Sequence, residues 1–506
     1  MPAMLPHVDA TFAPLPQPAA RVHLTTLHQR TPIIEALRCY AAAESVSFST
    51  PGHKGGAGLD AQVRELLGSR FAGADVWLNT ADHDRTRRLA EDLAAETWGA
   101  ERSFFLVNGS SSGNQALLLA TLNPGDEVIV GRDLHQSMLA ALIQTGARPV
   151  YVAPRLHPDL NVGLGIAVDD VVAKIEAHPA AKLILVTSPS YWGVASDLSG
   201  IVSAAHARGV AVYVDEAWGP HFGFHPDLPT SAMHAGADGA VTSPHKLLTG
   251  LSQAALLNVR GMRFDLARVA NAVKLLQTTS PLMPILASLD ACRQQMALSG
   301  RELMERTIGL AEWARSALRR LPGIAVLDAV QLGLLNGHYD PTRLVIDVSG
   351  LGITGYAAER FLREQCGLAP EMSDSAGLVC LVTLGDTRES LRRLVTAVGS
   401  LRSQVTGDGF AARCSRVAGE AIAPGEQVLT PREAYFAPSR AIPLAQAAGA
   451  VAAEAVIPYP PGIPVLLPGE IISAIKLECL REGLAAGMHL RGVADASLRT
   501  LRVVEA

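Results

Sequence analysis

Residues 182–218 read KLILVTSPSYWGVASDLSGIVSAAHARGVAVYVDEAW, a pattern in which two apolar runs enclose a helix-length segment. The apolar runs are 182–187 and 210–215, and the segment 198–209 between them has the character of a helix. Near-continuous apolar strands that alternate with helices indicate a parallel or mixed sheet covered on both faces. Because the alternation extends over residues 102–260, we predict an α/β fold, in which ligands gather at the carboxyl ends of the strands.

The composition narrows the class of protein. The chain has 506 residues, of which 48% are hydrophobic and 18% charged, and its formal net charge is −5. This weakly acidic balance argues against nucleic-acid binding. No apolar run approaches the roughly 18 residues that span a bilayer, and the N-terminus lacks the apolar segment of a signal peptide. Six scattered cysteines without CxxC spacing favour reduced thiols and a cytoplasmic location, and we assign no residue to a metal.

Changes of pattern along the chain predict its domains. The mostly helical connection after the first sheet is followed by a second strand–helix pattern, and later by a proline-rich extended path. We predict a flexible N-terminal arm (1–30), a large domain with its N-terminal segment (31–320), a smaller α+β domain (325–405), a linker (406–427) and a C-terminal segment (428–506).

Three polar features follow strands of the predicted sheet. The segment NGSSSGN (108–114) opens a helix whose free N–H groups suit a phosphate, although serines also cap helices without binding a ligand. Asp215 ends a buried strand, where a carboxylate needs a cation or donors; a helix cap or a loop carboxylate is the alternative. Lys246 follows a later strand and is one of six lysines. Pyridoxal 5′-phosphate needs a phosphate cradle, a partner for its ring nitrogen and a lysine for covalent attachment, in agreement with this set.

Eight ordered segments carry a family resemblance. They are STPGHKGG (49–56), FFLVNGSSSGNQA (104–116), TSPSYWGVASDL (187–198), VDEAWGPHF (214–222), SPHKLLTGLSQAALL (243–257), TTSPLMPILASLD (278–290), GLGITGYAAERFL (350–362) and PYPPGIPVLLPGE (458–470). In these the chain resembles the Orn/Lys/Arg decarboxylases, a family of fold-type-I pyridoxal-phosphate enzymes. The resemblance is to the short form, which lacks the N-terminal response-regulator-like wing domain.

The resemblance implies roles for individual residues. Lys246 is expected to attach the cofactor, Asp215 to pair with the ring nitrogen, His135 to stack on the ring and Ala217 to pack under its other face. Lys246 or His245 is expected to return the proton to the substrate carbon. The phosphate-side candidates are Ser110, Ser111, Ser112, Ser243 and His245. Because active sites in this family form between two subunits, Ser280 is expected to reach a partner's phosphate in a homodimer or dimer-based oligomer, and the C-terminal segment to complete the site.

The resemblance also implies a reaction and a substrate. We expect decarboxylation of a small-molecule amino acid substrate with a basic side chain, arginine first and then lysine or ornithine. An aminotransferase or an oxidase acting on a basic amino acid is the alternative. Trp218 stands where the short forms of the family usually carry a histidine, and Trp192 stands where a second tyrosine is common. A carboxylate must bind the distal cation, and Glu371, Asp374, Glu454 and Glu470 are candidates. Of these we favour Glu470, with Trp218, Tyr191 and His53 as further substrate contacts.

Overall fold

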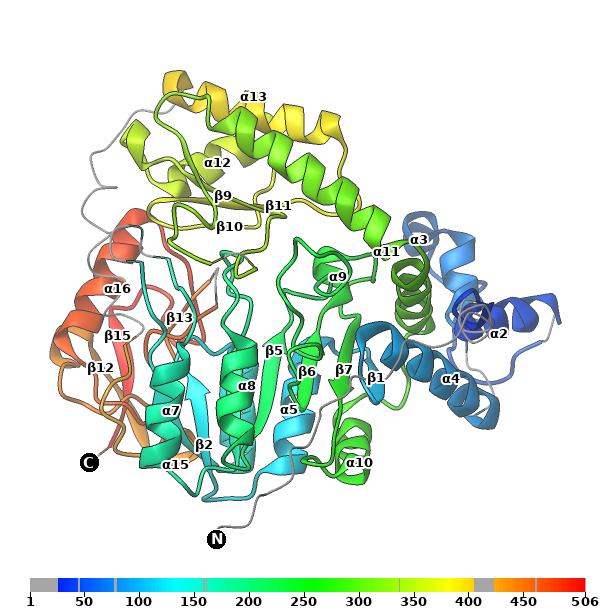
Figure 1. Ribbon diagram of the computed structural model, residues 1–506, viewed down its shortest axis with the longest axis horizontal. Coiled ribbons are helices and arrows are strands. Elements are labelled where there is room, and N and C mark those ends of the chain that lie inside the picture. The colour runs from blue at the N-terminus through cyan, green and yellow to red at the C-terminus, as the bar shows by residue number, and fades with distance from the viewer. Residues whose placement is uncertain are drawn as a thin grey trace, which may run out of the picture.

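The computed structural model describes residues 26–43, 46–76, 80–157, 160, 162–335, 337–404, 423–459 and 462–505 (Figure 1). Most of the predicted N-terminal arm (1–30) and of the predicted linker (406–427) lies outside the described residues. Within the described part, no helix is long and apolar enough to cross a membrane.

The large domain is built on one seven-stranded sheet with the order β1-β7-β6-β5-β4-β2-β3. β7 runs antiparallel to both of its neighbours, and the other pairs are parallel, so the sheet is mixed. This arrangement confirms the predicted α/β fold. The strands are β1 (Arg102–Leu106), β2 (Glu127–Gly131), β3 (Arg148–Val152), β4 (Leu183–Thr187), β5 (Ala211–Glu216), β6 (Gly239–Thr242) and β7 (Ala255–Val259).

Helices cover both faces of this sheet, which is why its strands are apolar along their whole length. In β4, Leu183 and Leu185 pack into one core with α5, α6 and α10, whereas Ile184 and Val186 pack into another core with α7 and α8. The bounds are α5 (Gly109–Thr121), α6 (Gln136–Thr145), α7 (Val168–Ala177), α8 (Leu198–His206) and α10 (Leu266–Leu276).

A second, four-stranded sheet lies above the large domain in Figure 1. It is antiparallel, with the order β10-β11-β9-β8, and is covered by helices α12 (Gly355–Cys366) and α13 (Arg388–Gln404). The long helix α11 (Met283–Leu318) joins it to the large domain. The strands are β8 (Ala325–Leu327), β9 (Arg343–Asp347), β10 (Met372–Ser373) and β11 (Gly377–Leu381).

The C-terminal segment forms a small unit with its own core beside the large domain. It contains α15 (Pro431–Phe436), α16 (Ala474–Ala486) and the strand pairs β12 (Ser439–Pro443) with β15 (Thr500–Val504) and β13 (Ile457–Pro458) with β14 (Leu490–Arg491).

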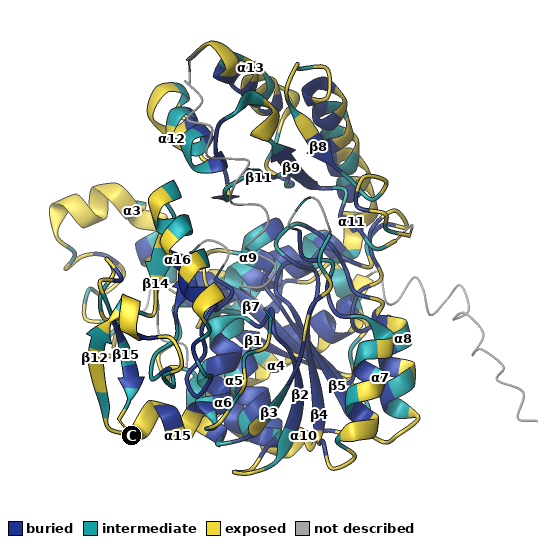
Figure 2. Ribbon diagram, turned by 90° about the vertical axis from the view of Figure 1, so that its left-hand side faces the viewer, coloured by how far each residue is buried: buried dark blue, intermediate teal, exposed yellow. Residues whose placement is uncertain are grey.

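The N-terminal helices extend to the other side of the molecule. They are α2 (Pro32–Ala42), α3 (Ala61–Ala74) and α4 (Thr80–Trp98), and α3 projects with much of its surface exposed (Figure 2).

Candidate active site

A cavity of about 470 Å³ opens at the carboxyl ends of the large-domain strands. Eight of the residues predicted for the site line it, and they come from separate parts of the chain. They are Ser110, Ser111, His135, Tyr191, Trp218, His245, Lys246 and Glu371. The wall is completed by Gly109, Gln253, Leu381 and Tyr459.

Lys246 lies in the short helix α9 (Pro244–Leu247), which follows β6. Its Nζ is 4.0 Å from the centre of the Trp218 ring. Burial lowers the pKa of the Lys246 amine to about 8; Asp215 raises this pKa and Arg343 lowers it further. An amine with such a pKa is neutral in an appreciable fraction of molecules near neutral pH, and a neutral amine is the nucleophile that attacks a carbonyl carbon.

Asp215 is the second-to-last residue of β5, and two donors hold its side chain. Its Oδ2 accepts a hydrogen bond from Nδ2 of Asn114 at 2.8 Å, and its Oδ1 accepts one from the backbone N–H of Ala217 at 3.1 Å. The Asn114 side chain is fixed in turn, because its Oδ1 accepts a hydrogen bond from the Tyr213 hydroxyl at 2.9 Å. The Asp215 carboxylate is therefore buried and held in one orientation by these two hydrogen bonds.

The same network reaches His135, which caps the N-terminus of α6. Asn114 also donates to the Ser137 hydroxyl at 2.9 Å, and that hydroxyl lies 2.8 Å from Nδ1 of His135. Burial lowers the pKa of His135, while the charge of Asp215 raises it. Sequence reasoning missed Asn114 and Ser137. For Asn114 a signal existed, because it lies four residues after Ser110 on one helix and thus on the same face.

The phosphate-side candidates divide into two groups. Ser110 and Ser111 line the cavity in the first turn of α5, whereas the Ser112 hydroxyl donates to the Gly109 carbonyl at 2.8 Å. The hydroxyl of Ser243 is buried without a hydrogen-bond partner among the described residues, and so is the hydroxyl of Thr187, which pairs in register with Asp215. Orphaned hydroxyls at the end of β4 and directly after β6, together with the first turn of α5, fit a bound group that carries a phosphate and further polar atoms.

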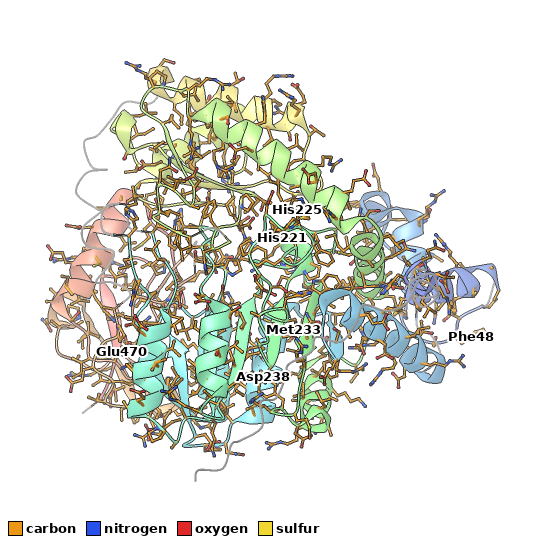
Figure 3. All side chains as sticks on the ribbon, viewed as in Figure 1. Phe48, His221, His225, Met233, Asp238 and Glu470 are labelled. Atoms are coloured by element: carbon orange, nitrogen blue, oxygen red, sulfur yellow. The ribbon has the colours of Figure 1, made fainter. Side chains whose placement is uncertain are left out.

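Glu470, favoured above as the substrate carboxylate, does not line the cavity. It is fully buried among the C-terminal elements (Figure 3), where Nε and Nη2 of Arg132 each donate to one of its oxygens at 3.0 Å. Nζ of Lys476 donates to Oε2, also at 3.0 Å. Burial would raise the pKa of Glu470, but these two cations hold it below its usual value. The rigid proline-rich path thus presents Glu470 to Arg132 rather than to a ligand.

Among the residues predicted to contact the substrate or a partner subunit, four others also lie outside the cavity wall of this chain. Nε2 of His53 lies 3.0 Å from Oδ2 of Asp75 in the N-terminal segment, and Ser280 is exposed. Asp374 and Glu454 accept hydrogen bonds from backbone N–H groups and shape turns.

Three cavity residues come from outside the large domain: Glu371, Leu381, which ends β11, and Tyr459. Glu371 lies next to β10 and is exposed, so that its carboxylate is accessible to a ligand. Tyr459 comes from the proline-rich segment, and the guanidinium carbon of Arg491 lies 3.6 Å from the centre of its ring. Tyr459 carried no signal of its own, because only the folded chain shows which loop meets the cavity.

Comparisons with known proteins place the chain in a family. The profile of the Orn/Lys/Arg decarboxylase major domain matches residues 31–338, and that of the C-terminal domain of the same family matches residues 419–482. An arginine decarboxylase from Halalkalibacterium halodurans is 39% identical over 94% of this chain and 98% of its own length, and one from Bacillus subtilis is 38% identical over 94% and 98%.

Solved structures agree with this result. Lysine decarboxylase A from Pseudomonas aeruginosa has a TM-score of 0.82 and 25% sequence identity, covering 96% of this chain and 82% of its own. The constitutive lysine decarboxylase of Escherichia coli, at 23% identity and a TM-score of 0.81, shows the same fold. Sequence, cavity and comparisons lead to one conclusion: this chain belongs to the Orn/Lys/Arg decarboxylase family.

Proposed function

We propose that the protein decarboxylates a basic amino acid with the help of pyridoxal 5′-phosphate, with arginine as the preferred substrate ahead of lysine and ornithine. The observation that carries this proposal is the position of Lys246, a buried amine of lowered pKa in the cavity wall of a chain from a decarboxylase family. Arginine is placed first because relatives that are 38–39% identical are arginine decarboxylases, whereas a lysine decarboxylase is 26% identical.

The residues of the cavity fit the cofactor. Lys246 would attach it and Asp215 would face its ring nitrogen, while Ser110, Ser111 and Ser243 would receive the phosphate. When bound, pyridoxal phosphate withdraws electrons from the substrate carbon joined to it, which weakens a bond at that carbon. Trp218, Tyr191 and Leu381 contribute apolar surface that excludes water, a setting that favours loss of a carboxylate as neutral CO2.

The proton that replaces the carboxylate comes from Lys246 in this proposal. His245 is the alternative, but its Nδ1 lies 2.8 Å from the Ala254 carbonyl oxygen and must carry a proton to donate to it. Its Nε2 is then an acceptor unless the ring is charged, and burial lowers the pKa of His245, which disfavours the charged form. Lys246 keeps a titratable nitrogen inside the cavity and is the better donor.

Glu371 is the residue that we propose for the distal cation of the substrate. It is the carboxylate that the described residues contribute to the cavity wall, and it belongs to the smaller domain. A carboxylate in the cavity wall suits a guanidinium, which offers planar paired donors.

We also propose a homodimer or dimer-based oligomer in the cytoplasm. The N-terminal segment exposes large apolar side chains, with Val46, Phe48 and Leu66 exposed by 80%, 94% and 84%. Phe48 projects at the edge of the molecule in Figure 3. A second copy would cover such a surface, and His53 and Ser280 would then be available to the partner's cavity.

A substrate screen tests the reaction. The purified protein, loaded with pyridoxal phosphate, is incubated with arginine, lysine or ornithine, and CO2, keto acid and peroxide are measured. We expect one CO2 for each amine formed, fastest with arginine. Keto acid without CO2 would show an aminotransferase, peroxide would show an oxidase, and either result would overturn the proposal.

A further inference from the structure

A closed ring of four buried residues joins the two domains directly behind the cavity. Trp218 and His221 belong to one loop of the large domain, and Asp340 and Arg343 to one segment of the smaller domain. Nη2 of Arg343 donates to the Trp218 carbonyl at 3.0 Å, and Nε of Arg343 lies 3.3 Å from Oδ2 of Asp340. The same Oδ2 lies 3.1 Å from Nε2 of His221.

The four residues of this ring are buried, and the two domains approach each other closely around them. Asp340 and Arg343 are fully buried, and His221, which lies between the large-domain sheet and the smaller domain in Figure 3, is 1% exposed. The backbone N–H of Asp340 donates to the Gly193 carbonyl at 2.8 Å. A Cβ at Gly193 would lie 2.5 Å from Cγ of Arg343, so only glycine permits this approach of the two domains.

The Trp218 ring makes cation–π contacts with one residue from each domain. The Arg343 guanidinium carbon is 4.8 Å, and Nζ of Lys246 is 4.0 Å, from the centre of the Trp218 ring. Arg343 itself does not line the cavity. Arg343 therefore acts on the site indirectly. It contacts the indole ring of Trp218, and its charge acts on Lys246.

We propose that Arg343, anchored by Asp340 and His221, is a positioning residue that fixes Trp218 against Lys246 and sets the charge of the Lys246 nitrogen from the smaller domain. This inference rests on the proposed function, since it concerns the lysine that attaches the cofactor. It makes docking of the smaller domain a condition for the working state of that lysine.

Because Arg343 and Asp340 carry opposite charges, removing one or the other should shift the pKa of the Lys246 nitrogen in opposite directions. The cation Arg343 lowers the pKa of the Lys246 nitrogen. Asp340 is the anion paired with Arg343, and its negative charge opposes that effect. Arg343→Gln should therefore raise the pKa of the Lys246 nitrogen by about one pH unit, whereas Asp340→Asn should lower it. The other titratable groups that face Lys246 keep their identity in both variants: Asp215, His135, His245, Glu371, Tyr191 and Tyr459. Of these, Glu371 also responds to Arg343, whose charge lowers the pKa of the Glu371 carboxyl.

The experiment follows the visible absorption band of the bound cofactor against pH in the holoenzyme, together with kcat and KM. The matched control is Asp290→Asn, because Asp290 and Arg293 form another fully buried Asp–Arg pair three residues apart, remote from the cavity wall. This control should lose stability in urea but keep the wild-type titration. Arg343→Lys, which keeps the charge, should keep the wild-type pKa with a lowered kcat.

Each outcome decides the matter. Opposite shifts in Arg343→Gln and Asp340→Asn support the proposal, and if Arg343→Gln fails to fold, the downward shift in Asp340→Asn with a wild-type pKa in Arg343→Lys supports it. Unchanged titration in folded variants, or the same shift in Asp290→Asn, overturns it while leaving the proposed function intact. Failure of the wild-type protein to bind the cofactor overturns the proposed function instead.

Discussion

Arg132 and Glu470 lie 338 residues apart in the sequence and form a buried two-pronged ion pair, with both N–O distances at 3.0 Å. The remaining donors of Arg132 bind the carbonyls of Pro464 and Val465 at 2.6 and 3.1 Å. Arg132 follows β2 and stands three residues before His135. The pair therefore fastens the proline-rich segment, which carries Tyr459, to the turn that carries His135.

Glu470→Gln should destabilise the protein without a specific loss of substrate affinity. The change leaves Arg132 and Lys476 buried without their anion, which costs about 3–5 kcal/mol. Urea unfolding should show this loss, while KM for arginine in the remaining folded protein stays within about twofold of the wild type. A tenfold higher KM with unchanged stability would instead restore Glu470 as a substrate contact.

Glu371→Gln should weaken the binding of arginine while leaving the stability of the protein nearly unchanged. Loss of one charge-assisted hydrogen bond, worth about 1.5–3 kcal/mol, should raise KM for arginine about 10- to 100-fold with little effect on unfolding. Preference for arginine over its uncharged analogue citrulline should fall by the same factor. The control is Glu389→Gln, because Glu389 is exposed on α13 and paired with Arg392. Equal effects in the two variants would exclude a substrate role for Glu371.

Lys246→Ala should abolish turnover, with CO2 release from arginine reduced by about 10³-fold or more, because no other lysine lines the cavity in the described part of the chain. Lys274→Ala, on the exposed side of α10, should keep wild-type rates. Near-normal CO2 release from the Lys246 variant would remove the central residue of the proposed function.

The sequence predicted those parts of the site that follow from local pattern. Asp215 stands near the end of a strand, and Ser110 and Lys246 lie in the helices that follow two other strands. The carboxyl ends of neighbouring parallel strands meet at one edge of the sheet, wherever the distant segments pack. Glu470, Glu371 and Tyr459 differ because their roles depend on which segment packs where. The prolines restrict the local backbone conformation of this segment. Only the folded chain shows that Glu470 pairs with Arg132 and that Tyr459 lines the cavity.

The ring formed by Trp218, His221, Asp340 and Arg343 also depends on tertiary packing and could not be predicted from local sequence pattern. Asp340 and Arg343 carry no motif, and their spacing resembles that of Asp290 and Arg293, which bind backbone groups elsewhere. What separates the two pairs is the partner that each meets in the tertiary structure, and no sequence period encodes that partner.

The lowered pKa of Lys246 should be visible as a pH-dependent stability of the cofactor-free protein. Burial lowers this pKa from 10.5 in the unfolded chain to about 8 in the folded one. Between these values the unfolded state binds a proton that the folded state does not, so stability rises with pH through this window. Below pH 8 the folded protein carries the full penalty of a buried ammonium group, about 3 kcal/mol.

Lys246→Met removes this penalty. The cofactor-free variant should be more stable than the cofactor-free wild type by about 3 kcal/mol at about pH 7, and the difference should vanish near pH 10.5. Urea unfolding of both proteins across this range measures the difference, and other titrating groups cancel because the two chains share them. Lys274→Met should show no such trend, since Lys274 is exposed. A difference between Lys246→Met and wild type that stays constant with pH would mean that Lys246 titrates normally, and the neutral amine required for cofactor attachment would have to be produced in another way.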